Sequence, residues 1–300
     1  MDRIVEFSEV DYISRQRIIN KICEKYKFIK KGIIGKSVFG SDITALKIGS
    51  GESYNLIAAA FHGSERITSV ILLRFIEDFC CSLENNEYIC GFNANVVLKN
   101  KGIIFVPCIN PDGCDISLLG EKAICKNIID YKKLSKGNYH KWNANARGVD
   151  INHNFDADWE NLRLKERELG IYGPAMSRFG GNKPHSEPET LALVNLCQNI
   201  KINQVTALHS QGEVIYWDYK GIEVPKARSK AQILATAASY KLSEPEPIAT
   251  GGGFKDWFIK EFKRPGFTIE LGKGENPLPI HLSEQIYDKV KQMLTLSAII

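Results

Sequence analysis

Tyr54-Asn-Leu-Ile-Ala-Ala-Ala-Phe-His-Gly-Ser-Glu65 is the stretch of sequence that decides the fold. It opens with a short apolar run, which predicts a buried β-strand. Ser64 is of a residue type that favours a helix N-cap, and apolar residues at helical spacing follow it. We therefore expect the strand to run directly into a helix over 64–83. His62 would lie at the carboxyl end of the strand, and Glu65 in the first helical turn.

Strand-like and helix-like segments alternate along the rest of the chain. Helices are expected over 8–27, 187–200, 226–240 and 283–298, strands over 102–107, 204–209 and 265–271, and a hairpin over 36–48. This alternation predicts an α/β fold with a mixed, mostly parallel central sheet and helices on both faces. Because no linker or internal repeat interrupts it, we expect a single domain over 1–300, with 1–30 as an N-terminal helical segment packed on it.

The composition is that of an ordinary globular protein, with 44% hydrophobic and 25% charged residues. A net charge of +4 without a long single-sign run argues against a nucleic-acid partner. No apolar run is long enough to cross a membrane. This composition is compatible with a small peptide substrate. The sequence does not indicate the oligomeric state.

The eight cysteines form no Cys-x-x-Cys pair, so the sequence gives no support to a thiolate zinc site or to thioredoxin-like chemistry. Met1–Phe7 lack the apolar core of a signal peptide. We therefore expect a cytoplasmic protein with free, buried thiols.

The candidate metal ligands are His62, Glu65 and His209. His209 ends the strand-like run Ala207-Leu208-His209. Three protein ligands with one open position are typical of catalytic zinc, whereas structural zinc is usually closed by four. Ligands gather at the carboxyl ends of strands in open α/β sheets, so we expect all three side chains at one edge. They would hold one zinc ion, although other first-row metals accept the same donors. The alternative is that His62 and Glu65 are ordinary polar residues on the protein surface, as most isolated His-x-x-Glu pairs are.

Further motifs follow in a fixed order. They are Asn110-Pro-Asp-Gly113, Arg147-Gly-Val-Asp-Ile-Asn-His-Asn-Phe155, His185-Ser-Glu-Pro-Glu-Thr190, Leu208-His-Ser-Gln211, Gly251-Gly-Gly-Phe-Lys-Asp-Trp257 and Phe267-Thr-Ile-Glu270. In this order and spacing the set resembles the zinc carboxypeptidase family of metallopeptidases, over residues 40–280. Two runs, 209–217 and 270–279, look most like the branch of γ-D-glutamyl-L-diamino acid endopeptidases, which cut bacterial cell-wall peptides.

Glu270 is the candidate general base, because it is the one carboxylate on the apolar strand 265–271. Beside a metal it could take a proton from water and pass it to the leaving amine. It matches the catalytic glutamate of the family that the sequence resembles. The alternative is an edge-strand glutamate in solvent.

The resemblance also implies roles for two residues of the Arg147–Phe155 motif. Arg147 is a candidate for stabilising the oxyanion, since a fixed guanidinium donates paired hydrogen bonds. Asn152 matches the family's asparagine that binds the substrate carboxylate. A surface arginine beside a glycine turn and an Asx-turn residue are the alternatives.

Two positions, His153 and Ile248, depart from the digestive carboxypeptidases of this family. His153 stands where an arginine usually clamps the terminal carboxylate, and its charge depends on pH. Ile248 stands where those enzymes carry a tyrosine. Lys255 matches a position that faces the side-chain pocket, where a cation would suit an acidic group of the substrate; the alternative is a solvated surface lysine. The residues at 153 and 248 together argue against ordinary C-terminal exopeptidase activity.

The resemblance and these departures together predict a zinc-dependent metallopeptidase. Its expected substrate is the γ-D-glutamyl–diamino acid (meso-diaminopimelate) amide bond of peptidoglycan-derived peptides. The alternatives are a metallocarboxypeptidase or N-acyl amino acid deacylase on the same scaffold, and a catalytically inactive peptide-binding protein.

Overall fold

A computed structural model describes residues 3–99 and 101–300 and has a mixed eight-stranded sheet at its centre. In spatial order the strands are β1 (Lys30–Lys36), β2 (Asp42–Ile48), β6 (Gly102–Val106), β3 (Tyr54–Ala59), β7 (Ile202–His209), β10 (Gly266–Glu270), β8 (Val214–Tyr216) and β9 (Lys241–Leu242). The inner strands β6, β3, β7 and β10 are parallel to one another, and antiparallel pairs flank them. A separate small hairpin joins β4 (Tyr88–Ile89) to β5 (Phe92–Asn93).

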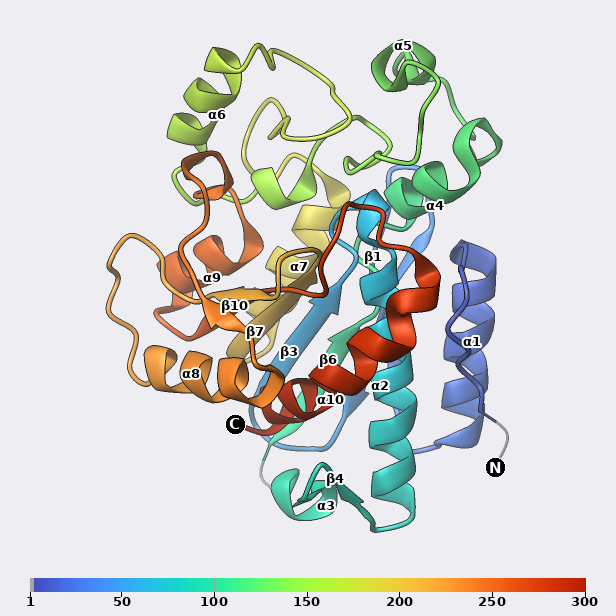
Figure 1. Cartoon of the computed structure of the whole chain (residues 1–300), viewed down its shortest axis with the longest axis vertical. Coiled ribbons are helices and arrows are strands. Elements are labelled where there is room, and N and C mark those ends of the chain that lie inside the picture. Colours follow the sequence, from blue (N-terminus) through green and yellow to red (C-terminus); the bar gives the residue numbers. More distant parts are fainter. Residues whose placement is uncertain (1–2, 100) are drawn as a thin grey trace.

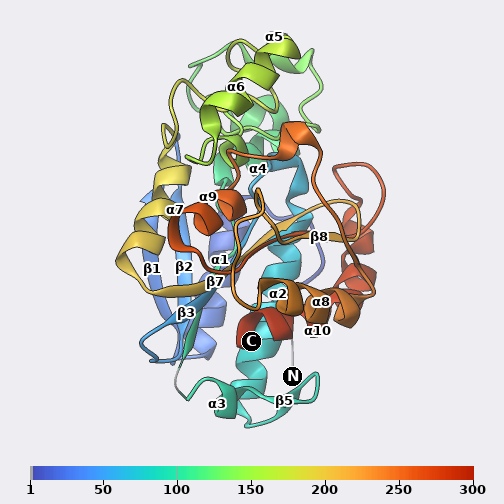
Figure 2. The same cartoon turned by 90° about the vertical axis from the view of Figure 1, so that its left-hand side faces the viewer.

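Helices cover both faces of the sheet (Figures 1 and 2). One layer contains α1 (Tyr12–Lys25), α2 (Ile67–Glu84), α8 (Ala227–Ala238) and α10 (Ser283–Ile299), and the other contains α7 (Pro188–Asn199) and α9 (Phe254–Phe262). The remaining helices are α3 (Ala94–Val97), α4 (Pro111–Leu119), α5 (Tyr131–Ser135) and α6 (Trp159–Glu168). Figure 1 shows α4, α5 and α6 beyond the carboxyl ends of the parallel strands. The predicted α/β fold is therefore confirmed.

Strand β3 shows why the first apolar run lacks an alternating pattern. All six of its residues are buried. Leu56 and Ala58 join the hydrophobic cluster on one face of the sheet, whereas Ile57 and Ala59 join the cluster on the other. A central parallel strand covered on both sides reads as a continuous apolar run for this reason.

The chain leaves β3 differently from the sequence-based expectation, because Ser64 is not the N-cap of α2. Gly63–Glu65 form a 3₁₀ turn, and α2 begins only at Ile67. A Cβ on Gly63 would come within 2.2 Å of the Gly113 carbonyl oxygen, so the turn is pressed against the start of α4. The Ser64 hydroxyl instead donates to Oδ1 of Asn143.

Several short elements have no clear signal in the sequence. The patterns did not predict α4, α6, α9 or β8. Helix α4 has only nine residues and contains a glycine, and α9 starts directly after the glycines 251–253. Packing against the rest of the fold, rather than local helix or strand propensity, determines whether such short elements form.

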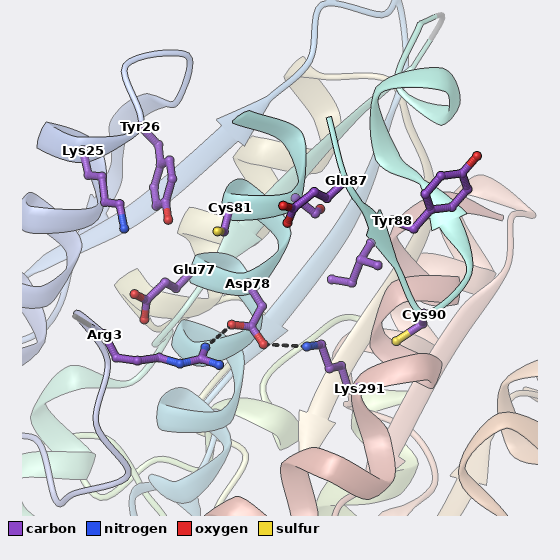
Figure 3. Close-up of a pocket in the computed structure, with 12 residues that line it drawn as sticks. Arg3, Lys25, Tyr26, Glu77, Asp78, Cys81, Glu87, Tyr88, Cys90 and Lys291 are labelled. Atoms are coloured by element: carbon purple, nitrogen blue, oxygen red, sulfur yellow. Dashed lines mark hydrogen bonds and ion pairs between the residues drawn. The ribbon is translucent and has the colours of Figure 1, made fainter. Parts of the chain in front are cut away.

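The N-terminal segment is tied to the helical layer that contains α2 and α10. Arg3 donates to Asp78 of α2, and Lys291 of α10 donates to the same carboxylate at 2.7 Å (Figure 3). The backbone N–H groups of Ile4 and Val5 donate to the Glu77 carboxylate. Met1 and Asp2, the first residues of the predicted 1–30 segment, lie outside the described residues.

Across residues 3–99 and 101–300, no helix combines the length and the apolar character that crossing a membrane requires.

Glu189 of α7 is a fully buried carboxyl group that bridges distant parts of the fold. It accepts hydrogen bonds from the Val38 N–H and from Nδ2 of Asn145. Burial, and next the nearby Asp112 carboxylate, raise its pKa to about 8. Glu189 is therefore protonated in the folded protein at neutral pH.

This raised pKa predicts a pH-dependent stability. Between the ordinary pKa of about 4.5 and the folded value of about 8, the folded state binds more protons at Glu189 than the unfolded state. The free energy of unfolding therefore falls as pH rises through this window, by at most about 1.4 kcal/mol per pH unit. Glu189→Gln cannot ionise and should make that slope less negative in urea unfolding series from pH 5 to pH 8. The exposed Glu168→Gln is the matched control; equal slopes for Glu189→Gln and the unmodified protein would contradict this account.

Candidate metal centre

The three predicted metal ligands meet at the carboxyl edge of the parallel sheet. His62 follows β3, Glu65 ends the 3₁₀ turn, and His209 is the last residue of β7. One donor atom from each lies within 4.8 Å of the other two. Nδ1 of His62 is 2.8 Å from Oε1 of Glu65, and Nδ1 of His209 is 3.0 Å from Oε2. Two imidazoles thus face one carboxylate.

This donor set fits a zinc ion. Imidazole nitrogen and carboxylate oxygen are zinc ligands, and three of them leave a coordination position for water or substrate. His209 and Glu65 are buried, whereas the His62 side chain keeps 15% of its surface exposed. Burial would lower the pKa of His62, but the Glu65 and Asp150 carboxylates outweigh it and raise that pKa well above its ordinary value. The residues therefore concentrate negative charge where a cation would sit.

Asp150 orients His62 from the side opposite Glu65. Its Oδ1 lies 3.0 Å from Nε2 of His62, and its Oδ2 accepts the Arg178 N–H at 2.8 Å. Burial would raise the pKa of Asp150, but the charge and hydrogen bond of His62 outweigh it and hold that pKa well below its ordinary range. Carboxylates in this position fix the tautomer of a ligating histidine and increase its basicity. The sequence motif contains Asp150, yet no spacing rule connects it to a histidine 88 residues earlier.

Further contacts fix the other two ligands. The His209 ring stacks on Phe61, with ring centroids 5.0 Å apart. The Ser210 N–H donates to Oε2 of Glu65 at 3.2 Å, and Nδ2 of Asn276 donates to Oε1 at 3.4 Å. Each ligand is thus held by its own neighbours before any metal binds.

Glu270 lies beside these ligands at the end of β10. It is paired in parallel register with His209. Its side chain is partly exposed, and in the described part of the chain its carboxylate has no hydrogen-bond or ion-pair partner. Burial, and next the Glu65 charge, raise its pKa well above the ordinary value. An unpaired carboxylate of raised basicity is what a general base requires.

Asn152 and His153 lie together in the 3₁₀ turn Ile151–His153. Oδ1 of Asn152 accepts the Phe254 N–H at 3.0 Å, which leaves the amide N–H groups for other partners. Nδ1 of His153 is 2.8 Å from Oε1 of the buried Glu166. Burial lowers the pKa of His153 and outweighs the attraction of the Asp150 carboxylate, so this ring is neutral at neutral pH.

Arg147 does not join this group of residues. Its side chain is half exposed, with NH1 3.4 Å from Oε2 of Glu187. It lines a cavity of about 700 Å³ whose described lining includes Val149 and Phe179 but none of the three metal ligands.

Lys255 is buried, and its charge is used within the protein. Its Nζ donates to the Asp218 carbonyl at 2.6 Å and forms an ion pair with Asp256. Asp256 in turn accepts the Gly251 N–H at 2.8 Å. A substrate carboxylate would therefore compete with Asp256 for this ammonium group.

Residues 16–295 match the family described as zinc carboxypeptidase. The chain belongs to the zinc carboxypeptidase family. It is thus a metallopeptidase and a hydrolase, zinc is its cofactor, and the resemblance seen in the sequence is confirmed.

Relatives and solved structures agree with this family. Gamma-D-glutamyl-L-diamino acid endopeptidase 1 of Lysinibacillus sphaericus is 33% identical over 285 residues, which cover 93% of this chain and 69% of that protein. Murein peptide amidase A of Escherichia coli strain K12 is 28% identical over 211 residues, which cover 67% and 64%. The crystal structure of thrombin activatable fibrinolysis inhibitor gives a TM-score of 0.74 at 19% identity, covering 97% of this chain and 74% of that one. This last likeness shows the shared fold.

The Asp150–His62 contact gives a prediction for this zinc peptidase. Asp150→Asn keeps the side-chain shape but removes the charge that polarises His62, so zinc affinity should fall by about 10–100-fold. Competition with a chromogenic chelator measures the change. The exposed Asp156→Asn is the control and should bind zinc as the unmodified protein does. Equal affinity in Asp150→Asn would show that the contact does not support the metal.

Proposed function

We propose that this zinc peptidase hydrolyses the γ-D-glutamyl–diamino acid (meso-diaminopimelate) amide bond of peptidoglycan-derived peptides. The observation that carries the proposal is the unpaired Glu270 carboxylate beside the His62, Glu65 and His209 donors. The substrate class is supported by the names of two relatives, an endopeptidase for γ-D-glutamyl-L-diamino acid and a murein peptide amidase.

The chemistry divides between the metal and Glu270. A bound zinc ion supplies Lewis acidity, which acidifies water and polarises a carbonyl group. Glu270 accepts the proton of the attacking water and then delivers it to the leaving amine of the diamino acid. Burial and the Glu65 carboxylate raise the pKa of Glu270, whereas a nearby cation lowers it, so the two influences oppose each other at this group.

Asn152 is the residue we propose to bind a carboxylate of the substrate. Because its Oδ1 is held by the Phe254 N–H, its amide N–H groups are the free donors. His153 would assist through a hydrogen bond rather than a permanent charge, since burial keeps its ring neutral. Oxyanion stabilisation by Arg147 and recognition of an acidic group by Lys255 would each require an existing ion pair, to Glu187 or Asp256, to open.

His153 also argues against ordinary carboxypeptidase activity. A neutral imidazole binds a terminal carboxylate less strongly than an arginine, which donates a charged, paired set of hydrogen bonds. Ile248 lies in the 3₁₀ turn Pro247–Ala249, and its side chain has no hydroxyl to offer. Release of C-terminal residues from ordinary L-peptides, or deacylation of N-acyl amino acids, would favour the alternative enzymes of the same scaffold.

We further propose that residues 1–300 act as one zinc peptidase domain in the cytoplasm. Its partners would be small murein-derived peptides, without nucleic acid or membrane.

Glu270→Gln tests the base. The amide cannot accept a proton, so kcat should fall by about 10²–10⁴-fold. Zinc content should stay unchanged, because Glu270 is not a ligand. Glu244→Gln, an exposed residue, is the control. Retained kcat in zinc-loaded Glu270→Gln would exclude this role.

The substrate is tested with L-Ala-γ-D-Glu-meso-diaminopimelate and zinc-loaded protein, with the products identified by mass spectrometry. We expect L-Ala-D-Glu and free diaminopimelate. Zinc-loaded protein that leaves the tripeptide intact but cleaves a C-terminal L-residue from a control peptide would overturn the substrate proposal.

A further inference from the structure

Two buried cysteines lie close together near the metal-binding edge of the sheet. Cys108 follows β6, and Cys114 lies in α4. Their Sγ atoms are 3.7 Å apart. The side chains are 6% and 1% exposed and pack with Ala60 in a small cluster of their own. The two thiols are thus within hydrogen-bonding distance and shielded from bulk water.

Arg15 of α1 is a buried cation beside this pair. Only 1% of its surface is exposed, and within the described residues NH1 and NH2 have no hydrogen-bond partner. The nearest carboxylate, on Asp115, is 3.7 Å from NH2 and already accepts the Tyr12 N–H. A buried charge is costly unless an opposite charge lies close. Burial would lower the pKa of Arg15, but negative charge on Cys108 and then Cys114 outweighs it and raises that pKa.

The surroundings shift the pKa values of the two thiols in opposite directions. Burial would raise the pKa of Cys108, but the hydrogen bond from Cys114 and the Arg15 charge together lower it, although the Asp115 carboxylate opposes them. The same hydrogen bond, and next burial, raise the pKa of Cys114 well above its ordinary value. Of the two thiols, Cys108 is therefore the one that ionises more readily, with Cys114 as its hydrogen-bond donor and Arg15 as the nearby buried cation.

We propose that Cys108 and Cys114 are a redox-active dithiol that hydrogen peroxide closes to a disulfide. The Cys108 thiolate attacks one peroxide oxygen, which gives a sulfenic acid at Cys108 and releases hydroxide. Sγ of Cys114 then attacks Sγ of Cys108, its proton joins the departing hydroxyl group, and water leaves. The hydroxide takes up the proton that Cys108 lost on ionisation, so in sum two thiols and one peroxide give one disulfide and two waters.

The position of the pair connects it to the metal site. Asn110, between the two cysteines, donates Nδ2 to the Phe61 carbonyl at 2.9 Å, one residue before His62. Its Oδ1 accepts the Gly113 N–H at 3.0 Å, next to Cys114. A disulfide bond is about 2.05 Å long, so closure must draw the two sulfurs together across this segment. We therefore expect disulfide formation to shift the backbone segment that positions His62.

The test uses reduced, zinc-loaded protein of residues 1–300 treated with a small excess of hydrogen peroxide. Both cysteines fall in one tryptic peptide, residues 102–122, so closure appears as the loss of two hydrogens from that peptide. Cys197 is an internal control, because it is equally buried and burial alone raises its pKa. We expect the 102–122 peptide to be oxidised at least about tenfold faster than Cys197. Equal rates, or closure only after unfolding, would overturn the proposal.

Variants separate the roles of the three residues. Cys114→Ser should stop the reaction at a sulfenic acid on Cys108, which dimedone traps. Arg15→Leu should slow oxidation by about tenfold, whereas Arg17→Leu, exposed on the same helix, should not. If Arg15→Leu does not fold, the Cys114→Ser result decides: absence of a trapped sulfenic acid contradicts the proposal.

The link to the metal site has its own readout. Loss of zinc to a chelator should be about tenfold faster from the oxidised than from the reduced protein, the size of effect typical when the surroundings of a ligand shift. Equal rates of zinc loss from the oxidised and reduced proteins would show that disulfide formation does not affect the position of His62.

Discussion

The parallel pairing of β7 with both β3 and β10 is the constraint on which the rest of the site depends. Ala59 is in register with Leu208, and Glu270 is in register with His209. Three strands that run the same way must end at the same edge (Figure 1). The pairing therefore brings together side chains that are more than two hundred residues apart in the chain. A shift of one residue in either strand would turn His209 or Glu270 to the other face of the sheet.

Most polar groups at this edge stay ordered because they are bonded before a metal or substrate arrives. Asp150 bonds to His62, and the Ser210 N–H and Asn276 bond to Glu65. Such a network is costly in the protein interior unless its members are paired, and here nearly all are. Within the described residues, Nε2 of His209 and the Glu270 carboxylate are exceptions without a hydrogen-bond partner, and the unpaired Glu270 carboxylate, within reach of solvent, is free to carry a proton.

The sequence predicts the inner part of this site well and its surroundings poorly. His62, His209 and Glu270 each end or follow an apolar strand, so local pattern and the rule for strand ends suffice to place them. Asp150 could not be assigned in this way, because its contact with His62 depends on tertiary packing. Ser64 fails as an N-cap for a similar reason, since Gly63 is pressed against Gly113 and Trp142. Arg147 and Lys255 show that a cation in a motif need not be a free cation in the fold.

The central claim is that His62, Glu65 and His209 hold a zinc ion while Glu270 and the cysteines do not. X-ray absorption spectroscopy of the zinc-loaded protein tests it most directly. The account predicts a first shell of nitrogen and oxygen only, at about 2.0–2.2 Å, with the scattering pattern of two imidazoles. A sulfur shell at about 2.3 Å, or a shell without imidazole, would contradict the account.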